Sequence, residues 1–284
     1  MKWILLFSLF FCSQCSHRKS YPFVKEPIDV VIPCSQKDAG VLEFCIEGIR
    51  KYGANIRRII VVSNERFTDK AEWFDEKNYP FAIGDLGSQI FPNDPDRAHW
   101  FSSQCPRRGW IYQQLLKLYA PVVIPDISSN VLVLDADVVF LRPVEFLTES
   151  GTGLYSTGSE YHLPYFEHMK RLLNLRRVFL RYSGICHHML FQRSVIEDLF
   201  AEIRTLHGKE PWQALCACID SKEVEGACMS EYEIYFNYLF LRSNQAKIRP
   251  LKWGNKVSFS EDSLEKYRQR NYDYVAYHAW ERTK

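Results

Sequence analysis

Residues 131–141 carry the most informative pattern in the chain: Val131-Leu132-Val133-Leu134-Asp135-Ala136-Asp137-Val138-Val139-Phe140-Leu141. The first four residues are apolar and partly β-branched, which predicts a buried strand. Two aspartates follow directly, and a second apolar run comes after them. Burying two carboxylates between apolar runs is costly unless they are paired or bind a cation. The stretch therefore predicts a positively charged partner at the end of a buried strand.

The chemistry of this aspartate pair favours a divalent metal ion. Two carboxylates and a diphosphate form an oxygen-rich site that suits Mn²⁺ or Mg²⁺. The alternative interpretation is that the two acids cap a turn at the strand end. The chain contains a second D-x-D, Asp94-Pro95-Asp96, in a polar stretch, and it serves as an internal control for a chance match.

The remaining periodicity predicts a single α/β domain with a mainly parallel sheet flanked by helices. Strands are expected at residues 28–33, 59–62 and 131–134, a short one near residues 79–83, and one or two within residues 178–191. Helices are expected at residues 39–52, 110–119, 194–206 (with Ser194 as N-cap) and 231–241, with a long loop at residues 87–108 and a buried tail at residues 272–280. In such folds ligands bind at the carboxyl ends of the strands.

Three segments resemble glycosyltransferases of the GT-A (Rossmann-like) type, including the family-8-like enzymes. Residues 119–144, which end in the D-x-D segment, are similar to the central part of these enzymes. Residues 28–35 resemble their first strand and uracil-contacting loop, and residues 230–237 resemble their acidic helix that faces the acceptor. The resemblance implies transfer of a sugar from a nucleotide-diphosphate donor, with a UDP-sugar as the first expectation, to a glycan or glycoconjugate, assisted by Mn²⁺ or Mg²⁺.

The resemblance also implies roles for particular residues. Asp135 would contact the donor ribose, or the metal through water, and Asp137 would ligate the metal directly. His278 would be the third ligand; the alternative is a hydrogen-bonded core histidine. The glycine and lysine pattern that follows this histidine in the family-8 enzymes is missing here. The expected donor-binding residues are Pro33, Ser35, Asn64, Lys117 and Asp135.

Spacing limits which of the further polar residues could take the donor and acceptor roles that the resemblance implies. Lys117 shares the helix face expected to pack toward the aspartates, so it is preferred over Arg107 and Arg108 as a donor contact. His187 and His188 are candidate acceptor contacts, but neighbours on a strand point to opposite faces, so one at most enters the cleft. Glu231 and Glu233 differ by about 200° around a helix, so only one can face the acceptor. That one would be the general base of an inverting reaction, whereas a retaining reaction would need none. Trp110, Tyr155 and Trp280 suit stacking on sugars.

The N-terminus and the cysteines bear on the compartment. Residues 1–20 have the layout of a signal peptide, with an apolar run at residues 3–11, or of a retained signal-anchor. The prediction is an exported or lumenal domain over residues 21–284, with membrane association through the N-terminal segment as an option. Cys216, Cys218 and Cys228 are read as an exposed segment that could form one bridge, with a zinc site as the less favoured alternative.

Composition and motif context limit the other functions. The formal charge of +2 excludes the strong basic field typical of nucleic-acid binders. A haloacid-dehalogenase-like phosphatase shares the motif, with Asp135 as nucleophile and Asp137 as acid, but that motif usually opens its domain. A non-catalytic sugar- or nucleotide-binding protein is the third alternative.

Overall fold

The computed structural model describes residues 18–255 and 258–278, and its centre is a five-stranded sheet. The strand order is β3-β2-β1-β4-β7, in which the first four strands are parallel and β7 is antiparallel to β4. The strands are β1 (Ile28–Pro33), β2 (Ile56–Ser63), β3 (Glu72–Asp75), β4 (Asn130–Leu134) and β7 (His188–Gln192). The predicted α/β fold with a mainly parallel sheet is confirmed.

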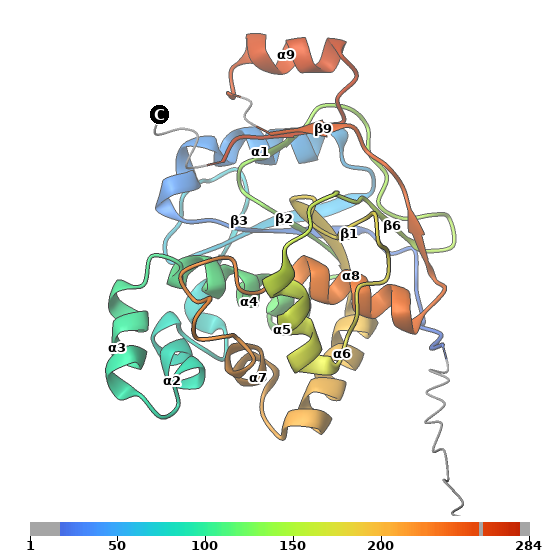
Figure 1. Ribbon diagram of the computed structural model, residues 1–284. Helices are drawn as coiled ribbons and strands as arrows, with labels where there is room; N and C mark the ends of the chain where they lie inside the picture. Colours follow the sequence, from blue (N-terminus) through green and yellow to red (C-terminus); the bar gives the residue numbers. More distant parts are fainter. Residues whose placement is uncertain (1–17, 256–257, 279–284) are drawn as a thin grey trace, which may run out of the picture.

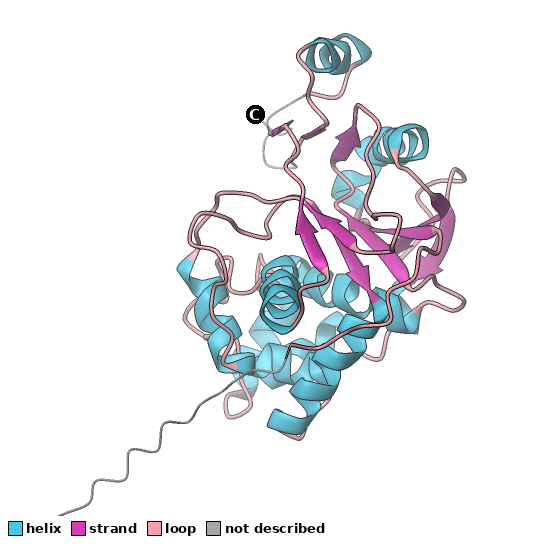
Figure 2. Cartoon of the chain, turned by 90° about the vertical axis from the view of Figure 1, so that its right-hand side faces the viewer, coloured by secondary structure: helices cyan, strands magenta, loops and turns pink. Residues whose placement is uncertain are grey.

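Helices cover both faces of the sheet, as Figures 1 and 2 show. Helix α1 (Ala39–Tyr52) lies on one face, and a larger helical layer lies on the other. That layer contains α4 (Arg108–Val123), α5 (Leu163–Leu173), α6 (Arg193–His207), α7 (Pro211–Ala217) and α8 (Glu231–Arg242), with α2 (Leu86–Ile90) and α3 (Pro95–Gln104) beside it. The short 3₁₀ helices are η1 (Gln36–Asp38), η2 (Glu76–Asn78) and η3 (Ile83–Asp85).

Two small sheets complete the fold. One has the order β5-β10-β9 and joins β5 (Val138–Phe140), β10 (Tyr274–Ala276) and β9 (Trp253–Gly254). The other pairs β6 (Gly153–Tyr155) with β8 (Ala246–Ile248), and α9 (Glu261–Gln269) precedes β10. The pairing of β10 with β5 is antiparallel and brings the end of the chain back to the strand after the aspartates.

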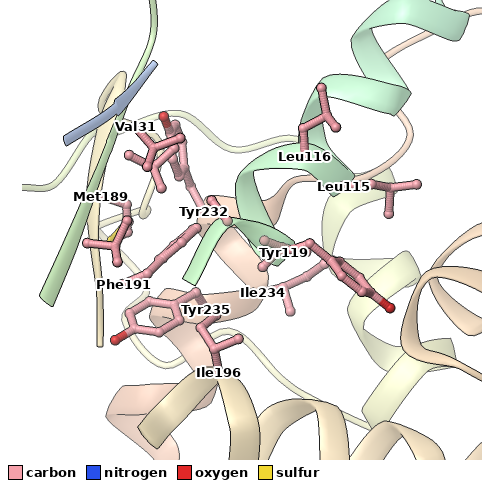
Figure 3. Close-up of a cluster of buried hydrophobic side chains, with 14 of the residues drawn as sticks. Val31, Leu115, Leu116, Tyr119, Met189, Phe191, Ile196, Tyr232, Ile234 and Tyr235 are labelled. Carbon is pink, nitrogen blue, oxygen red and sulfur yellow. The ribbon is translucent and has the colours of Figure 1, made fainter. Parts of the chain in front are cut away.

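The main core fills the space between the sheet and the larger helical layer. Figure 3 shows Val31, Met189 and Phe191 of the sheet beside Tyr232 and Tyr235 of α8, whereas Leu115 and Tyr119 of α4 point away from the strands into the helical layer. Strands β1 and β4 are buried along their whole length, which agrees with central strands covered on both faces. On the opposite face Gly48 lets α1 approach β5 closely, since an added Cβ would lie 3.0 Å from the Phe140 nitrogen.

Two predictions in the first half of the chain are wrong. Residues 79–83 form no strand; the third strand is β3, and Tyr79 and Phe81 instead pack in a buried aromatic cluster. The predicted loop at residues 87–108 contains α2 and α3. Helix α3 begins after Asp94, whose side chain accepts a hydrogen bond from the Arg97 N–H at 3.0 Å, with Pro95 in the first turn.

Other predictions are confirmed with small changes. The helices at residues 39–52, 110–119, 194–206 and 231–241 are present as α1, α4, α6 and α8. The N-cap of α6 is Gln192, not Ser194. The segment at residues 178–191 contributes a single strand, β7. The tail is buried at β10 as expected, and Trp280 lies outside the described residues.

The predictions for the cysteines and for the N-terminal leader have different outcomes. Cys216, Cys218 and Cys228 are buried, so the prediction of an exposed segment is wrong, and all seven cysteines of the described chain are free thiols. Residues 1–17, which hold most of the predicted leader, lie outside the described residues. Within the described ranges, no helix is long and apolar enough to cross a membrane.

Buried His168 of α5 predicts acid sensitivity. Burial lowers its pKa to about 4, and its Nε2 lies 2.9 Å from the Leu215 carbonyl oxygen. The unfolded chain takes up this proton near pH 6.5 and the native chain only near 4. The contribution of His168 to stability is therefore full above pH 6.5 and falls by about 1.4 kcal/mol per pH unit between these values.

Urea unfolding of the wild-type protein and His168→Gln from pH 7.5 to 4 tests this expectation. The glutamine can still donate to the Leu215 carbonyl oxygen but does not titrate. We expect the free energy of unfolding of the variant to fall less steeply than that of the wild type as the pH decreases. Identical slopes for the two proteins would contradict the lowered pKa of His168.

Candidate functional site

The aspartate pair lies where the strand order of the sheet reverses. Strand β1 has β2 on one side and β4 on the other, so the carboxyl ends of β1 and β4 flank a topological switch point. Asp135 follows β4 directly, and β1 ends at Pro33, two residues before Ser35. Parallel α/β sheets bind their ligands at this position. The fold therefore places Asp135 and Asp137 at the position where parallel α/β sheets bind their ligands.

Two antiparallel ladders bring distant residues to these aspartates. Past the end of the β4–β7 pairing, the Asp135 N–H donates to the His187 carbonyl oxygen at 3.0 Å. Past the end of the β5–β10 pairing, the Tyr277 N–H donates to the Asp137 carbonyl oxygen at 3.0 Å. These backbone bonds place His187 next to Asp135, and His278 next to Asp137.

Asp137 and His278 form the first half of the site. Asp137 Oδ2 lies 3.1 Å from His278 Nδ1, and both side chains are largely buried. The ring of His187 lies 4.9 Å from the ring of His278, between centroids, so the two histidines are adjacent. Three of the predicted site residues thus meet although they are far apart in the sequence.

Asp135, Lys117 and Glu231 form the second half. Lys117 Nζ lies 2.5 Å from Asp135 Oδ1 and donates to Glu231 Oε1 at 2.7 Å. The lysine is only 2% exposed and the glutamate 1%. Lys117 reaches the strand end from α4, on the helix face that the sequence analysis predicted.

The two acids that share Lys117 differ in the direction of their pKa shifts. Burial alone would raise the pKa of Asp135, but Lys117 and His187 outweigh it and hold that pKa well below its usual range. Burial likewise opposes the charge on Lys117, yet the two acids raise its pKa above the ordinary value. Burial raises the pKa of Glu231. With one lysine between two acids, Asp135 keeps its charge and Glu231 is the acid that protonates more readily.

His187 occupies an unusual backbone conformation between the two halves. Its φ of 64° is in the left-handed region, which is uncommon for a residue other than glycine. Its Nδ1 lies 3.7 Å from Asp135 Oδ2, and its Nε2 lies 3.1 Å from Asn255 Oδ1. Trp253 packs edge-on against the imidazole, with centroids 5.1 Å apart. Strained residues of this kind cluster at functional sites.

The structure separates both pairs of candidates, the glutamates by helical spacing as predicted and the histidines because only His188 lies on β7. His188 points into the core between Phe140, Phe146 and Tyr274, so it cannot serve as the expected acceptor contact. Glu233 turns away from the aspartates and is also only 1% exposed. It accepts a hydrogen bond from the Gly184 N–H at 3.1 Å and one from Asn237 at 2.6 Å. Burial raises its pKa to about 7.

The remaining candidates are exposed or contact other residues. Ser35 and Asn64 are exposed at the ends of β1 and β2, and the Pro33 carbonyl oxygen accepts from Gln113 at 3.5 Å. Arg107 stacks over Trp110 and contacts the Gly226 carbonyl oxygen, and Arg108 bonds the Cys105 carbonyl oxygen. Tyr155 is buried beside Tyr235, so its predicted role in sugar stacking is wrong.

Sequence reasoning missed three residues of this site. Tyr232 donates to Asp135 Oδ1 at 3.5 Å, and its ring lies 4.4 Å from Lys117 Nζ. Its position directly after Glu231 on α8 was the one signal that the sequence offered for it. Trp253 and Asn255 lie in a stretch without periodicity, which gave no signal.

The donor set fits a divalent cation that takes few protein ligands. No ready-made group of three or more His, Cys, Asp or Glu ligands exists among the described residues. However, the 3.1 Å between Asp137 Oδ2 and His278 Nδ1 is close to the spacing of about 3.0 Å between adjacent ligands on an octahedral ion with bonds of about 2.1 Å. Mg²⁺-like ions usually take one or two protein ligands and complete their shell with phosphate oxygens and water. Asp137 and His278 therefore fit such an ion, whereas Asp135 is already neutralised by Lys117.

Comparison with known proteins adds a family and a distant structural likeness. No curated protein sequence matches the chain. Among solved structures, the chain is similar to the crystal structure of the galactosyltransferase LgtC in complex with donor and acceptor sugar analogs. The identity is 13% and the TM-score 0.40, over 88% of this chain and 86% of that one. A family model covers residues 25–264, so the chain belongs to the family of unknown function DUF6492.

Proposed function

We propose that this protein is a glycosyltransferase that moves a sugar from a nucleotide-diphosphate donor, with UDP-sugar as the first expectation, to a glycan or glycoconjugate. One observation carries the proposal: the two acids of the D-x-D motif lie at the β1/β4 switch point, with His278 3.1 Å from the second acid. From the leader-like pattern at residues 1–20, we infer an exported or lumenal place of action.

In this proposal Asp137 and His278 hold a divalent cation, Mn²⁺ or Mg²⁺. When bound, the cation neutralises the charge that develops on the departing diphosphate. The exposed ends of β1 and β2, at Ser35 and Asn64, offer contacts to the nucleoside. Asp135 faces the donor ribose or a water on the metal, with its charge balanced by Lys117.

Glu231 supports this site as a positioning residue. Its carboxylate holds Lys117 at 2.7 Å, and at 1% exposure it has little access to an acceptor hydroxyl. Its placement, like that of Glu233, therefore suits a structural role better than proton transfer. His187 is the remaining acceptor candidate, since it borders the site and contacts Trp253.

Thermal unfolding with UDP, GDP and CMP, each with Mn²⁺ or EDTA, tests the proposal. We expect one nucleotide to stabilise the chain only with Mn²⁺, by about 2.7 kcal/mol when its concentration is 100 times Kd. Absence of any shift would refute the nucleotide site and bring the phosphatase alternative forward. Metal-dependent binding without any sugar transfer would identify a non-catalytic binding protein.

A further inference from the structure

An excursion between β6 and β7 carries an unusual share of the exposed apolar side chains. Residues 158–183, which include α5, are closed at their two ends by a bridge in which Gly158 and Ser183 exchange both backbone hydrogen bonds, at 2.9 and 3.0 Å. Eight large hydrophobic residues of the described chain are exposed, and four belong to this excursion: Tyr161, Leu163, Leu180 and Tyr182. Leu180 is the most exposed of all, at 86%.

Contacts among Tyr161, Phe166, Arg177 and Tyr182 link the two ends of the excursion. Tyr161 stacks on Phe166 with centroids 5.1 Å apart, and the Arg177 guanidinium lies 5.1 Å from the Tyr161 ring. Arg177 also donates to the Tyr182 carbonyl oxygen at 3.3 Å. We call the exposed surface of the excursion the 161–182 face; it comprises Tyr161, Leu163, Arg176, Arg177, Leu180, Arg181 and Tyr182.

The base of the 161–182 face is held firmly by α8. The Val178 N–H donates to Asn237 Oδ1 at 2.8 Å, and the Gly184 N–H donates to Glu233. Phe179 packs against Phe240, with centroids 5.2 Å apart. Because the residue before Leu180 is anchored inward, Leu180 itself is held outward instead of folding back onto the core.

The excursion is also basic. It contains five basic residues (Lys170, Arg171, Arg176, Arg177 and Arg181) and two acidic ones (Glu160 and Glu167), which gives +3, whereas the whole chain carries +2. Among the described residues, Arg176, Arg177 and Arg181 form no ion pair with a carboxylate. The surplus positive charge therefore lies beside the exposed leucines and tyrosines.

We propose that the 161–182 face docks on an anionic lipid surface. Arginines attract anionic headgroups, and tyrosine rings suit the headgroup level of a bilayer. Exposed leucines gain by entering the acyl boundary, whereas they offer nothing to the hydroxyls of a polysaccharide. The proposal goes beyond sugar transfer and does not require it, because lipid binding is measured without substrate.

Vesicle cosedimentation of the full chain tests the proposal. Vesicles of phosphatidylcholine alone are compared with vesicles of equal parts phosphatidylcholine and phosphatidylglycerol. Two variants remove the two components of the face: Leu180→Ser/Tyr182→Ser and Arg176→Gln/Arg181→Gln. The controls are Leu206→Ser, which removes a leucine that is 60% exposed on α6, and Lys222→Gln/Lys247→Gln, which removes the same charge elsewhere.

We expect binding to the anionic vesicles to fall roughly tenfold in each face variant and to stay unchanged in the controls. Unfolding midpoints should match the wild type, because the replaced side chains are exposed. Equal binding to neutral vesicles, or equal losses in the controls, would overturn the proposal. A self-association without vesicles that Leu180→Ser/Tyr182→Ser abolishes would instead assign the face to a second copy of the chain.

Discussion

Replacement of Lys117 by methionine is expected to lower the free energy of unfolding by about 3–5 kcal/mol. The methionine preserves most of the side-chain volume but leaves two acids, Asp135 and Glu231, without their shared cation. Glu231 is 1% exposed and cannot be rehydrated without disrupting the core. A buried charge without its partner accounts for losses of this size. Urea unfolding at neutral pH measures the effect.

Two further variants make this prediction specific. Lys117→Met/Glu231→Gln removes the buried acid together with the lysine, and we expect it to recover much of the lost stability. Lys247→Met replaces an exposed lysine and should change stability by less than about 0.5 kcal/mol. If Lys117→Met behaved like Lys247→Met, the buried ion-pair cluster would not exist as described.

Replacement of Asp137 by asparagine is expected to have the largest effect on activity. Asparagine keeps the size of the side chain but removes the negative charge that faces His278. Stabilisation of leaving-group charge by a bound metal is worth several kcal/mol, so turnover should fall at least ~10³-fold. Asp96→Asn alters the other D-x-D, at an exposed position in the first turn of α3, and serves as the matched control with unchanged turnover.

The central strands and the aspartate motif could be predicted because their signals are local. Strands β1 and β4 are continuous apolar runs, and α1 ends at Gly53 as its spacing indicates. Lys117 could be assigned to the aspartates because helical spacing fixes the face that a residue occupies. The opposite directions of Glu231 and Glu233 follow from the same helical geometry, whereas His187 precedes β7 and takes its direction from a left-handed backbone conformation.

The rest of the site depends on tertiary pairing. The approach of His278 to Asp137 needs the β5–β10 ladder, which joins segments about 140 residues apart, and here only a family resemblance suggested it. Trp253 and Asn255 reach His187 through the same small sheet. Helices α2 and α3 were missed because their sequences are polar and short. There a cap at Asp94, and not an apolar stripe, marks the helix start.

Release of nucleoside diphosphate from a panel of nucleotide sugars, with and without Mn²⁺, tests the central claim most directly. The proposed function predicts metal-dependent release from one class of donor, retained in Asp96→Asn and lost in Asp137→Asn. Release of inorganic phosphate from phosphomonoesters, with every nucleotide sugar left intact, would contradict it.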